Sequence, residues 1–132
     1  RYILEKNLIS KVKIIPFQNN PHKYLKIADI FLFTSKFEGL PNVLLEAQTL
    51  KKYIISTKCP TGPNEILLNG KAGDLIKIGD YKKMAEKIKY YINNKKKLKN
   101  KIKVGYKNLN RFDYNYNMKQ YSKIISNFIY FW

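Results

Sequence analysis

The sequence between residues 30 and 47 reads Ile30-Phe31-Leu32-Phe33-Thr34-Ser35-Lys36-Phe37-Glu38-Gly39-Leu40-Pro41-Asn42-Val43-Leu44-Leu45-Glu46-Ala47. Its first four residues are apolar, aromatic and β-branched, which is typical of a strand buried on both faces of a parallel sheet. The loop that follows ends in Pro41-Asn42, and a proline with its φ already fixed favours the first turn of a helix. The run therefore predicts a strand, a loop and a helix in direct succession.

Such a unit places free backbone N–H groups and the positive end of a helix dipole at the carboxyl edge of the sheet, where an anion such as phosphate binds. Glu38 lies in the loop, and Glu46 lies one turn into a helix predicted from about Asn42 to Leu50. Glu46 falls roughly 100° from the centre of the apolar stripe of that helix. Because a carboxylate accepts hydrogen bonds at two oxygens, we expect Glu46 to hold a ribose diol and Glu38 to reach a second group of the same ligand.

Two sequence frames resemble a known enzyme family. The first is Ser35-x-x-Glu38-Gly39-x-Pro41-Asn42-x-x-x-Glu46-Ala47, which is similar to the E-x7-E signature of retaining glycosyltransferases of the GT-B fold, glycosyltransferase family four. The second is the run from Ser56 to Leu67, with Gly62-Pro63-x-Glu65-Ile66, followed by Asn69-Gly70-Lys71-Ala72-Gly73. The resemblance extends from Val12 to the C-terminus and corresponds to the donor-binding, C-terminal domain of that family.

The resemblance implies transfer of a sugar from a nucleotide-diphosphate sugar to an acceptor hydroxyl, with retention and without a metal ion or other cofactor. It assigns the donor sugar to Glu38, as the catalytic residue, and the ribose hydroxyls to Glu46. The backbone that would approach sugar and phosphate belongs to Gly39, Leu40, Pro41, Asn42 and Val43. Phe17 would lie near the nucleotide base. The acceptor would be a sugar or a lipid-linked sugar in cell-surface polysaccharide or glycolipid synthesis.

Further strands are predicted at residues 12–15, 53–56 and 73–78, and short helices at residues 22–28 and after the turn at residues 62–65. Asp80 is expected to cap a long helix, and basic helices follow from Lys95, with a break near residues 111–113. The predicted class is α/β, a Rossmann-like parallel sheet with flanking helices and a helical C-terminal tail. We divide the chain into a partial nucleotide-sugar-binding domain, residues 1–94, and C-terminal helices, residues 95–132, that pack on it and on a missing N-terminal domain.

The composition indicates one globular core and a strong positive charge. Of 132 residues, 45% are hydrophobic and 14% aromatic, and 26 Lys and Arg against 9 Asp and Glu give a net charge of +17. This balance favours phosphorylated substrates, acidic lipid headgroups or nucleic acid as partners. The codon bias of an AT-rich genome explains it equally well, because Lys, Asn, Ile, Tyr and Phe are abundant together.

Other interpretations of single residues stay open. Glu65 either stabilises a helix start or acts as a functional acid. The single histidine, His22, has no nucleophile or orienting acid near it in the sequence, so we expect a surface residue. Cys59 is the only cysteine, which excludes an intrachain disulfide and a cysteine-cluster metal site, and we interpret it as a turn residue.

Two other function classes remain. A nucleotide-sugar epimerase of the same fold would share the sheet and the nucleotide site but would need further acids. A non-catalytic basic binding module would use the charge, but the sequence lacks an aromatic-basic sheet motif and a recognition-helix pattern, so nucleic acid is not an expected partner.

We interpret the chain, which begins with Arg1, as a piece of a longer cytoplasmic protein. In the resembled family a basic pair earlier in the domain neutralises the diphosphate, and the preceding domain binds the acceptor. Since neither is present, we expect these 132 residues alone to bind a nucleotide sugar weakly at most and to transfer nothing. The lysines at residues 95–97 form a solvated face or contact acidic lipids at the inner face of the membrane.

Overall fold

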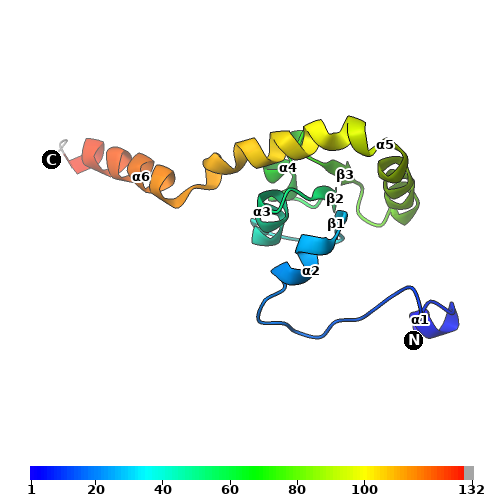
Figure 1. Ribbon diagram of the computed structural model, residues 1–132. Helices are drawn as coiled ribbons and strands as arrows, with labels where there is room; N and C mark the ends of the chain where they lie inside the picture. The colour runs from blue at the N-terminus through cyan, green and yellow to red at the C-terminus, as the bar shows by residue number, and fades with distance from the viewer. Residues whose placement is uncertain (130–132) are drawn as a thin grey trace.

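The computed structural model describes residues 1–129 and builds them around a three-stranded parallel sheet. The strands are β1 (Ile30–Phe33), β2 (Tyr53–Thr57) and β3 (Asp74–Ile76), in the spatial order β1-β2-β3 (Figure 1). The register places Leu32 opposite Ile55 and Ser56 opposite Leu75. A parallel sheet with helices between its strands confirms the predicted α/β, Rossmann-like class.

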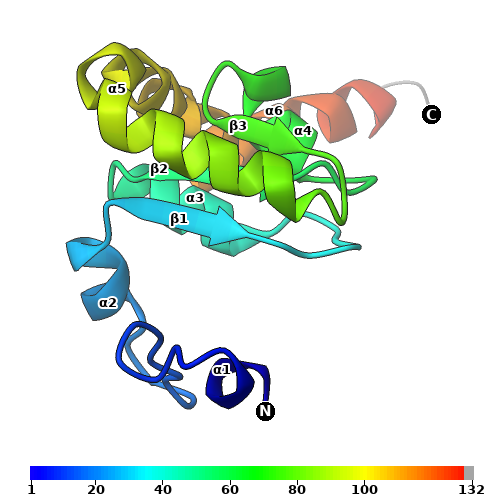
Figure 2. The ribbon, with the colours of Figure 1, turned by 90° about the vertical axis from the view of Figure 1, so that its right-hand side faces the viewer.

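Helices connect the strands and cover both faces of the sheet. They are α1 (Tyr2–Glu5), α2 (His22–Ile27), α3 (Asn42–Thr49), α4 (Pro63–Ile66), η1 (Leu68–Gly70), α5 (Tyr81–Lys107), η2 (Asn108–Phe112) and α6 (Tyr114–Ile129). In Figure 2, α5 lies on one side of the strands and α3 lies on the other. Each face therefore has its own apolar core.

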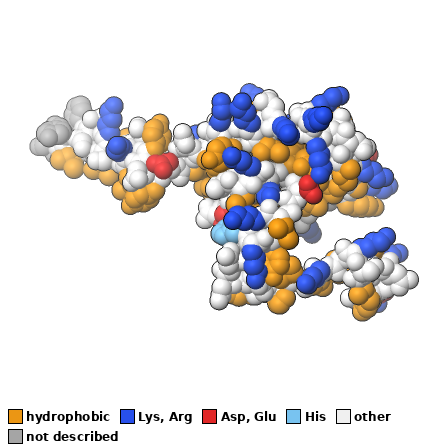
Figure 3. Space-filling model, viewed as in Figure 1, with side chains coloured by type: hydrophobic (Ala, Val, Ile, Leu, Met, Phe, Trp, Pro, Cys, Tyr) orange, Lys and Arg blue, Asp and Glu red, His pale blue; other side chains and the backbone are white. Residues whose placement is uncertain are grey.

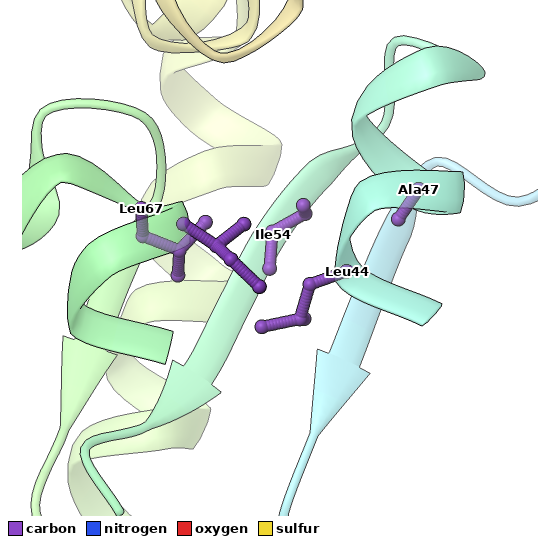
Figure 4. Close-up of a cluster of buried hydrophobic side chains, with 5 residues drawn as sticks. Leu44, Ala47, Ile54 and Leu67 are labelled. Carbon is purple, nitrogen blue, oxygen red and sulfur yellow. The ribbon is translucent and has the colours of Figure 1, made fainter. Parts of the chain in front are cut away.

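The first core lies between the sheet and helices α3 and α4. It is formed by Leu44, Ala47, Ile54, Ile66 and Leu67, of which Figure 4 labels four. These five side chains are at most 1% exposed. Because side chains alternate between the two faces of a strand, Ile54 points to this core while its neighbours in β2 point to the opposite one. The helix that follows β1 is thus fixed by burial of its apolar stripe.

The second core lies between the sheet and α5. Tyr53, Ile55 and Ile76 from the strands meet Tyr91 and Leu98 from the helix. The Tyr53 and Tyr91 rings are stacked with their centroids 4.7 Å apart. Residues on both sides of the predicted boundary at residue 94 therefore contribute to one core.

Helix α5 begins as predicted at Asp80, whose side chain accepts a hydrogen bond of 2.9 Å from the backbone N–H of Lys83. The helix continues through the predicted domain boundary to Lys107, with non-helical backbone angles at Asn94 (φ −131°, ψ 27°). The predicted break follows as η2 and an extended Asp113, whose carboxylate accepts from the N–H of Tyr116. The division of the chain at residue 94 stays a prediction.

The strand predicted at residues 12–15 is wrong. The structure gives this segment no regular secondary structure, and it runs as an extended connection between α1 and α2 (Figures 1 and 2). Ile14 is 78% exposed. A strand exists only where its backbone groups pair with another strand, and an apolar run by itself does not supply that partner.

Helix α6 extends away from the sheet (Figure 1) and has no buried residue. Apolar side chains appear on its surface in Figure 3, where Lys and Arg side chains are spread over all parts of the visible face. Tyr121, Ile125 and Phe128 are among the exposed apolar residues of this helix. Packing of this helix on a missing domain stays a prediction, and residues 130–132 lie outside the described residues. No helix within residues 1–129 has both the length and the apolarity to cross a bilayer.

Candidate functional site

At the carboxyl edge of the sheet, the loops that follow β1 and β2 are joined by hydrogen bonds. The Thr57 hydroxyl donates a hydrogen bond to the backbone carbonyl of Ser35, and the Thr61 hydroxyl donates to the backbone carbonyl of Glu38. Loop 34–41, after β1, is therefore anchored to the segment that follows β2. The ends of parallel strands lie at one edge, which is where ligands bind in open α/β sheets.

Gly62 allows the close approach of these two loops. Its φ is +81°, in the region that favours glycine, and a Cβ atom there would collide with the carbonyl oxygen of Gly39 and the ring of Pro41. Pro41 is buried and precedes the first residue of α3. The Gly62-Pro63 pair, noted in the sequence for its resemblance, thus shapes the loop that carries Glu38.

Glu38 is half-buried in that loop. Its Oε1 accepts a hydrogen bond of 2.5 Å from the Ser35 hydroxyl, three residues earlier. Its backbone carbonyl accepts from Thr61, so both the side chain and the main chain of Glu38 are restrained. The carboxylate keeps further lone pairs for a ligand hydroxyl.

Glu46 lies on the second turn of α3, on the border of the buried stripe, as its position in the helix predicts. Its Oε2 is 3.1 Å from Nε2 of His22 on α2, and its side chain is 40% exposed. It lines two adjoining hollows of about 750 and 380 Å³ between α2, α3 and the segment before α2. The smaller hollow is lined mostly by apolar side chains, among them Ile15, Tyr24 and Phe31. Both volumes suit a small ligand.

The backbone predicted to approach sugar and phosphate lies between the two acids. Residues 39 and 40 are exposed, and Asn42 and Val43 are the first two residues of α3. The first N–H groups of an α-helix have no acceptor within the helix, so they are available to an anion. Glu38 lines neither of the two hollows beside Glu46, and each acid has its own polar neighbour.

Phe17, predicted to lie near a nucleotide base, is 90% exposed. Its neighbours Pro16 and Gln18 line the smaller hollow with Glu46, and the Gln18 side chain accepts a hydrogen bond of 3.3 Å from the Tyr24 hydroxyl. The segment carrying Phe17 therefore borders the hollow, while the role given to Phe17 itself stays a prediction.

Two contacts were not foreseen from the sequence. His22 is half-exposed, as expected, but the fold brings it an acid that is distant in the sequence, because Glu46 is its partner. The two residues are separated by 24 positions, and only the packing of α2 beside α3 joins them. Glu65 forms an ion pair of 3.4 Å with Arg111 of η2 and so links α4 to the C-terminal helices.

The sequence model of a family described as glycosyl transferases group 1 matches residues 1–108. The chain belongs to this family. Among curated members of the glycosyltransferases, an uncharacterized glycosyltransferase of Methanocaldococcus jannaschii is 49% identical over 61 residues, which cover 46% of this chain and 15% of that protein. The capsular polysaccharide biosynthesis glycosyltransferase CapM of Staphylococcus aureus is 35% identical over 63% of this chain and 22% of that protein.

A third glycosyltransferase covers more of the chain. It is the N-acetylgalactosamine-N,N'-diacetylbacillosaminyl-diphospho-undecaprenol 4-alpha-N-acetylgalactosaminyltransferase of Campylobacter jejuni, 31% identical over 80% of this chain. The match covers 28% of that enzyme. The chain thus spans less than a third of the length of each of these three relatives.

Solved structures show the same fold. Anabaena HepE in complex with UDP superposes with a TM-score of 0.86 at 23% identity, covering 95% of this chain and 35% of that one. The C-terminal domain of the group 1 glycosyl transferase LpcC from Francisella tularensis superposes with a TM-score of 0.69 at 24% identity, over 86% of this chain and 58% of that one. The architecture is that of the C-terminal domain of GT-B glycosyltransferases, as predicted.

Proposed function

We propose that the protein to which this chain belongs transfers a sugar from a nucleotide-diphosphate sugar to an acceptor hydroxyl, with retention of the anomeric configuration. The proposal rests chiefly on one observation: Glu38 and Glu46 flank the start of α3 at the carboxyl edge of a parallel sheet, and Glu46 borders a hollow. Membership of the glycosyl transferases group 1 family supports it.

Each acid has a separate role in this proposal. Glu46 accepts hydrogen bonds from the two ribose hydroxyls, which a carboxylate with two oxygens suits. Glu38, restrained by Ser35 and Thr61, contacts the donor sugar. The two acids therefore contact different parts of the donor, and its base occupies the smaller, largely apolar hollow beside Glu46.

The backbone at the start of α3 supplies the electrostatic part of the proposed mechanism. As the bond between sugar and diphosphate breaks, negative charge grows on the leaving phosphate oxygen. The N–H groups of Asn42 and Val43 and the N-terminal end of the helix dipole are oriented before the reaction and stabilise that charge. The reaction in this proposal needs no metal ion, because backbone donors take the position of a cation.

The acceptor is proposed to be a growing cell-surface polysaccharide or a glycolipid. The printed names of CapM and of the Campylobacter enzyme, which refer to capsular polysaccharide and to a diphospho-undecaprenol substrate, support this class. A lipid-linked acceptor places the enzyme at the cytoplasmic face of a membrane, where Lys96 and Lys97 meet acidic headgroups, while Lys95 pairs with Asp29.

The decisive experiment uses the full-length enzyme. Calorimetry with UDP, GDP and ADP identifies the base, and incubation with the matching nucleotide sugars and a polysaccharide or lipid-linked acceptor detects transfer. We expect Glu46→Ala to weaken nucleotide binding and Glu38→Gln to lower turnover, and NMR of the product to show the anomeric configuration of the donor. Glu86→Ala is the control, since Glu86 pairs with Lys83 on the outer face of α5. Unchanged binding by Glu46→Ala, or an inverted product, would contradict the proposal.

A further inference from the structure

His22 and Glu46 line both of the hollows beside α3. They contact each other, with 3.1 Å between Nε2 and Oε2. Their side chains are 52% and 40% exposed, so a ligand in either hollow reaches them from solvent. The contact joins the first residue of α2 to the middle of α3.

An ionised carboxylate only accepts hydrogen bonds, so the imidazole is the donor in this contact, through a proton on Nε2. Two carboxylate oxygens offer about four lone-pair positions, of which His22 occupies one on Oε2. The remaining positions are sufficient for the two hydroxyls of a ribose. His22 and a bound nucleoside therefore use Glu46 at the same time and do not compete for it.

The lysines that line the larger hollow make other contacts and do not pair with Glu46. Lys23 and Lys26 also line the larger hollow, but the Lys23 ammonium lies 5.0 Å from the centroid of the Tyr24 ring. The backbone carbonyl of Lys26 accepts from Lys52, which fixes the end of α2 next to the segment after α3. Helix α2 is thus held in place at its far end while its first residue meets Glu46.

We infer that His22 is a positioning residue for the nucleotide site: it fixes the Glu46 carboxylate in the orientation that accepts the ribose hydroxyls. A free glutamate samples several rotamers, and ordering it on binding weakens the complex. A carboxylate already held by His22 avoids that cost. This inference rests on the proposed function, because it assumes that Glu46 is the acceptor for the ribose.

The test measures how much affinity the ribose 2′-hydroxyl supplies. In the full-length enzyme, calorimetry compares the tightest of UDP, GDP and ADP with its 2′-deoxy form. We expect the unmodified enzyme to prefer the ribonucleotide, and His22→Ala to lose roughly three- to tenfold in affinity for it, about the effect of one newly mobile side chain. The affinity for the 2′-deoxy nucleotide should fall less in His22→Ala than the affinity for the ribonucleotide does. His22→Gln, whose amide places an N–H close to the position of Nε2, should restore most of the preference.

Matched controls separate this effect from a general disturbance of the groove. Lys23→Ala alters the next residue of the same helix and the same hollow, and should leave the ratio of the two affinities unchanged. In the double variant His22→Ala/Glu46→Ala, the loss should equal that of Glu46→Ala alone, since His22 acts only through Glu46. Thermal unfolding of His22→Ala should match that of the unmodified enzyme.

The possible failures are distinguishable. If Glu46→Ala lowers the preference for the ribonucleotide but His22→Ala keeps it, the inference about His22 is overturned and the role of Glu46 stands. Losses that add in the double variant, or no rescue by His22→Gln, also overturn it. If Glu46→Ala itself keeps the full preference, the assignment of the ribose to Glu46 fails, and the inference fails with it.

Discussion

The phenol of Tyr53 donates a hydrogen bond of 2.9 Å to Oδ2 of Asp74, joining the first residues of two neighbouring strands. Lys101 of α5 donates to Oδ1 of the same carboxylate at 2.5 Å, and Lys87 lies 3.3 Å from Oδ2. The Asp74 side chain is only 6% exposed. A single buried acid therefore ties β2, β3 and both halves of α5 together, at the edge of the sheet opposite to the candidate site.

Replacing Asp74 should destabilise the domain without changing the proposed binding of a nucleotide at the opposite edge of the sheet. Asp74→Asn removes the charge that offsets two lysines and leaves polar groups poorly paired, so we expect a loss of about 3 kcal/mol in the free energy of unfolding. Urea unfolding of the full-length protein measures it. Asp29→Asn is the control, because Asp29 forms an exposed ion pair with Lys95 and should change stability little. Equal effects of the two changes would show that Asp74 does not act as a buried tie.

Stability should also depend on pH through Asp74. Burial raises its pKa, but hydrogen bonds from Lys101 and Tyr53 and the charges of both lysines outweigh burial, and the pKa is lowered. A lowered pKa in the folded state means that the contribution is fully present above the pKa of an unfolded aspartate, about 3.9, and is lost as the pH falls below it. We expect the unfolding midpoint of the unmodified protein to fall more steeply than that of Asp74→Asn between about pH 4 and pH 2. Parallel curves would refute this account.

Gly62→Ala should separate the two loops of the site. The new Cβ adds a strained positive φ and a collision with Gly39 and Pro41, so we expect a loss of about 2 kcal/mol or more in stability together with weaker nucleotide binding. Gly70→Ala is a matched control, since Gly70 also has a positive φ, +93°, but nothing lies within 4 Å of its Cβ position. It should show only the conformational cost, about 1 kcal/mol. Unfolding and calorimetry measure the two effects.

Ser35→Ala should reduce turnover more than affinity. The change removes the hydrogen bond that orients the Glu38 carboxylate and leaves Glu46 with its contact to His22. Because Glu38 is the proposed catalytic residue and a misplaced catalytic group slows the reaction, we expect kcat to fall roughly tenfold with little change in KM. Steady-state kinetics of the full-length enzyme provide the values. Ser126→Ala, on α6, is the control, because the Ser126 hydroxyl donates to the backbone carbonyl of Ser122 in its own helix, far from Glu38 in the sequence.

The isolated 132-residue chain should transfer no sugar. It spans less than a third of the length of the three relatives compared above, and the family resemblance assigns the acceptor to a preceding domain. A sensitive assay for released UDP, GDP or ADP, with Glu46→Ala of the same chain as background, checks this. Turnover above that background would show that residues 1–132 contain a complete active site.

Local patterns in the sequence determined most of the fold. The apolar runs predicted β1 and β2, and the Pro41-Asn42 pair predicted the start of α3 at Asn42. Asp80 was a correct helix cap. These features were predictable because strands buried on both faces and helix starts depend on residues adjacent in the chain. The placement of Glu38 and Glu46 around the start of α3 was predictable for the same reason, because only one loop and the first helix turn separate the two residues.

Only the tertiary structure decided which distant residues meet. Val12 to Ile15 had the pattern of a strand but found no partner, because pairing depends on another strand and not on the run itself. The contacts of Glu46 with His22 and of Asp74 with Tyr53 and Lys101 span 24, 21 and 27 positions. Side chains so far apart meet only when helices pack on the sheet, and burial then sets their partners and charges. The sequence was sufficient to identify Glu38 and Glu46 as the acids of the candidate site. The contact between Glu46 and His22 depends on the packing of α2 beside α3.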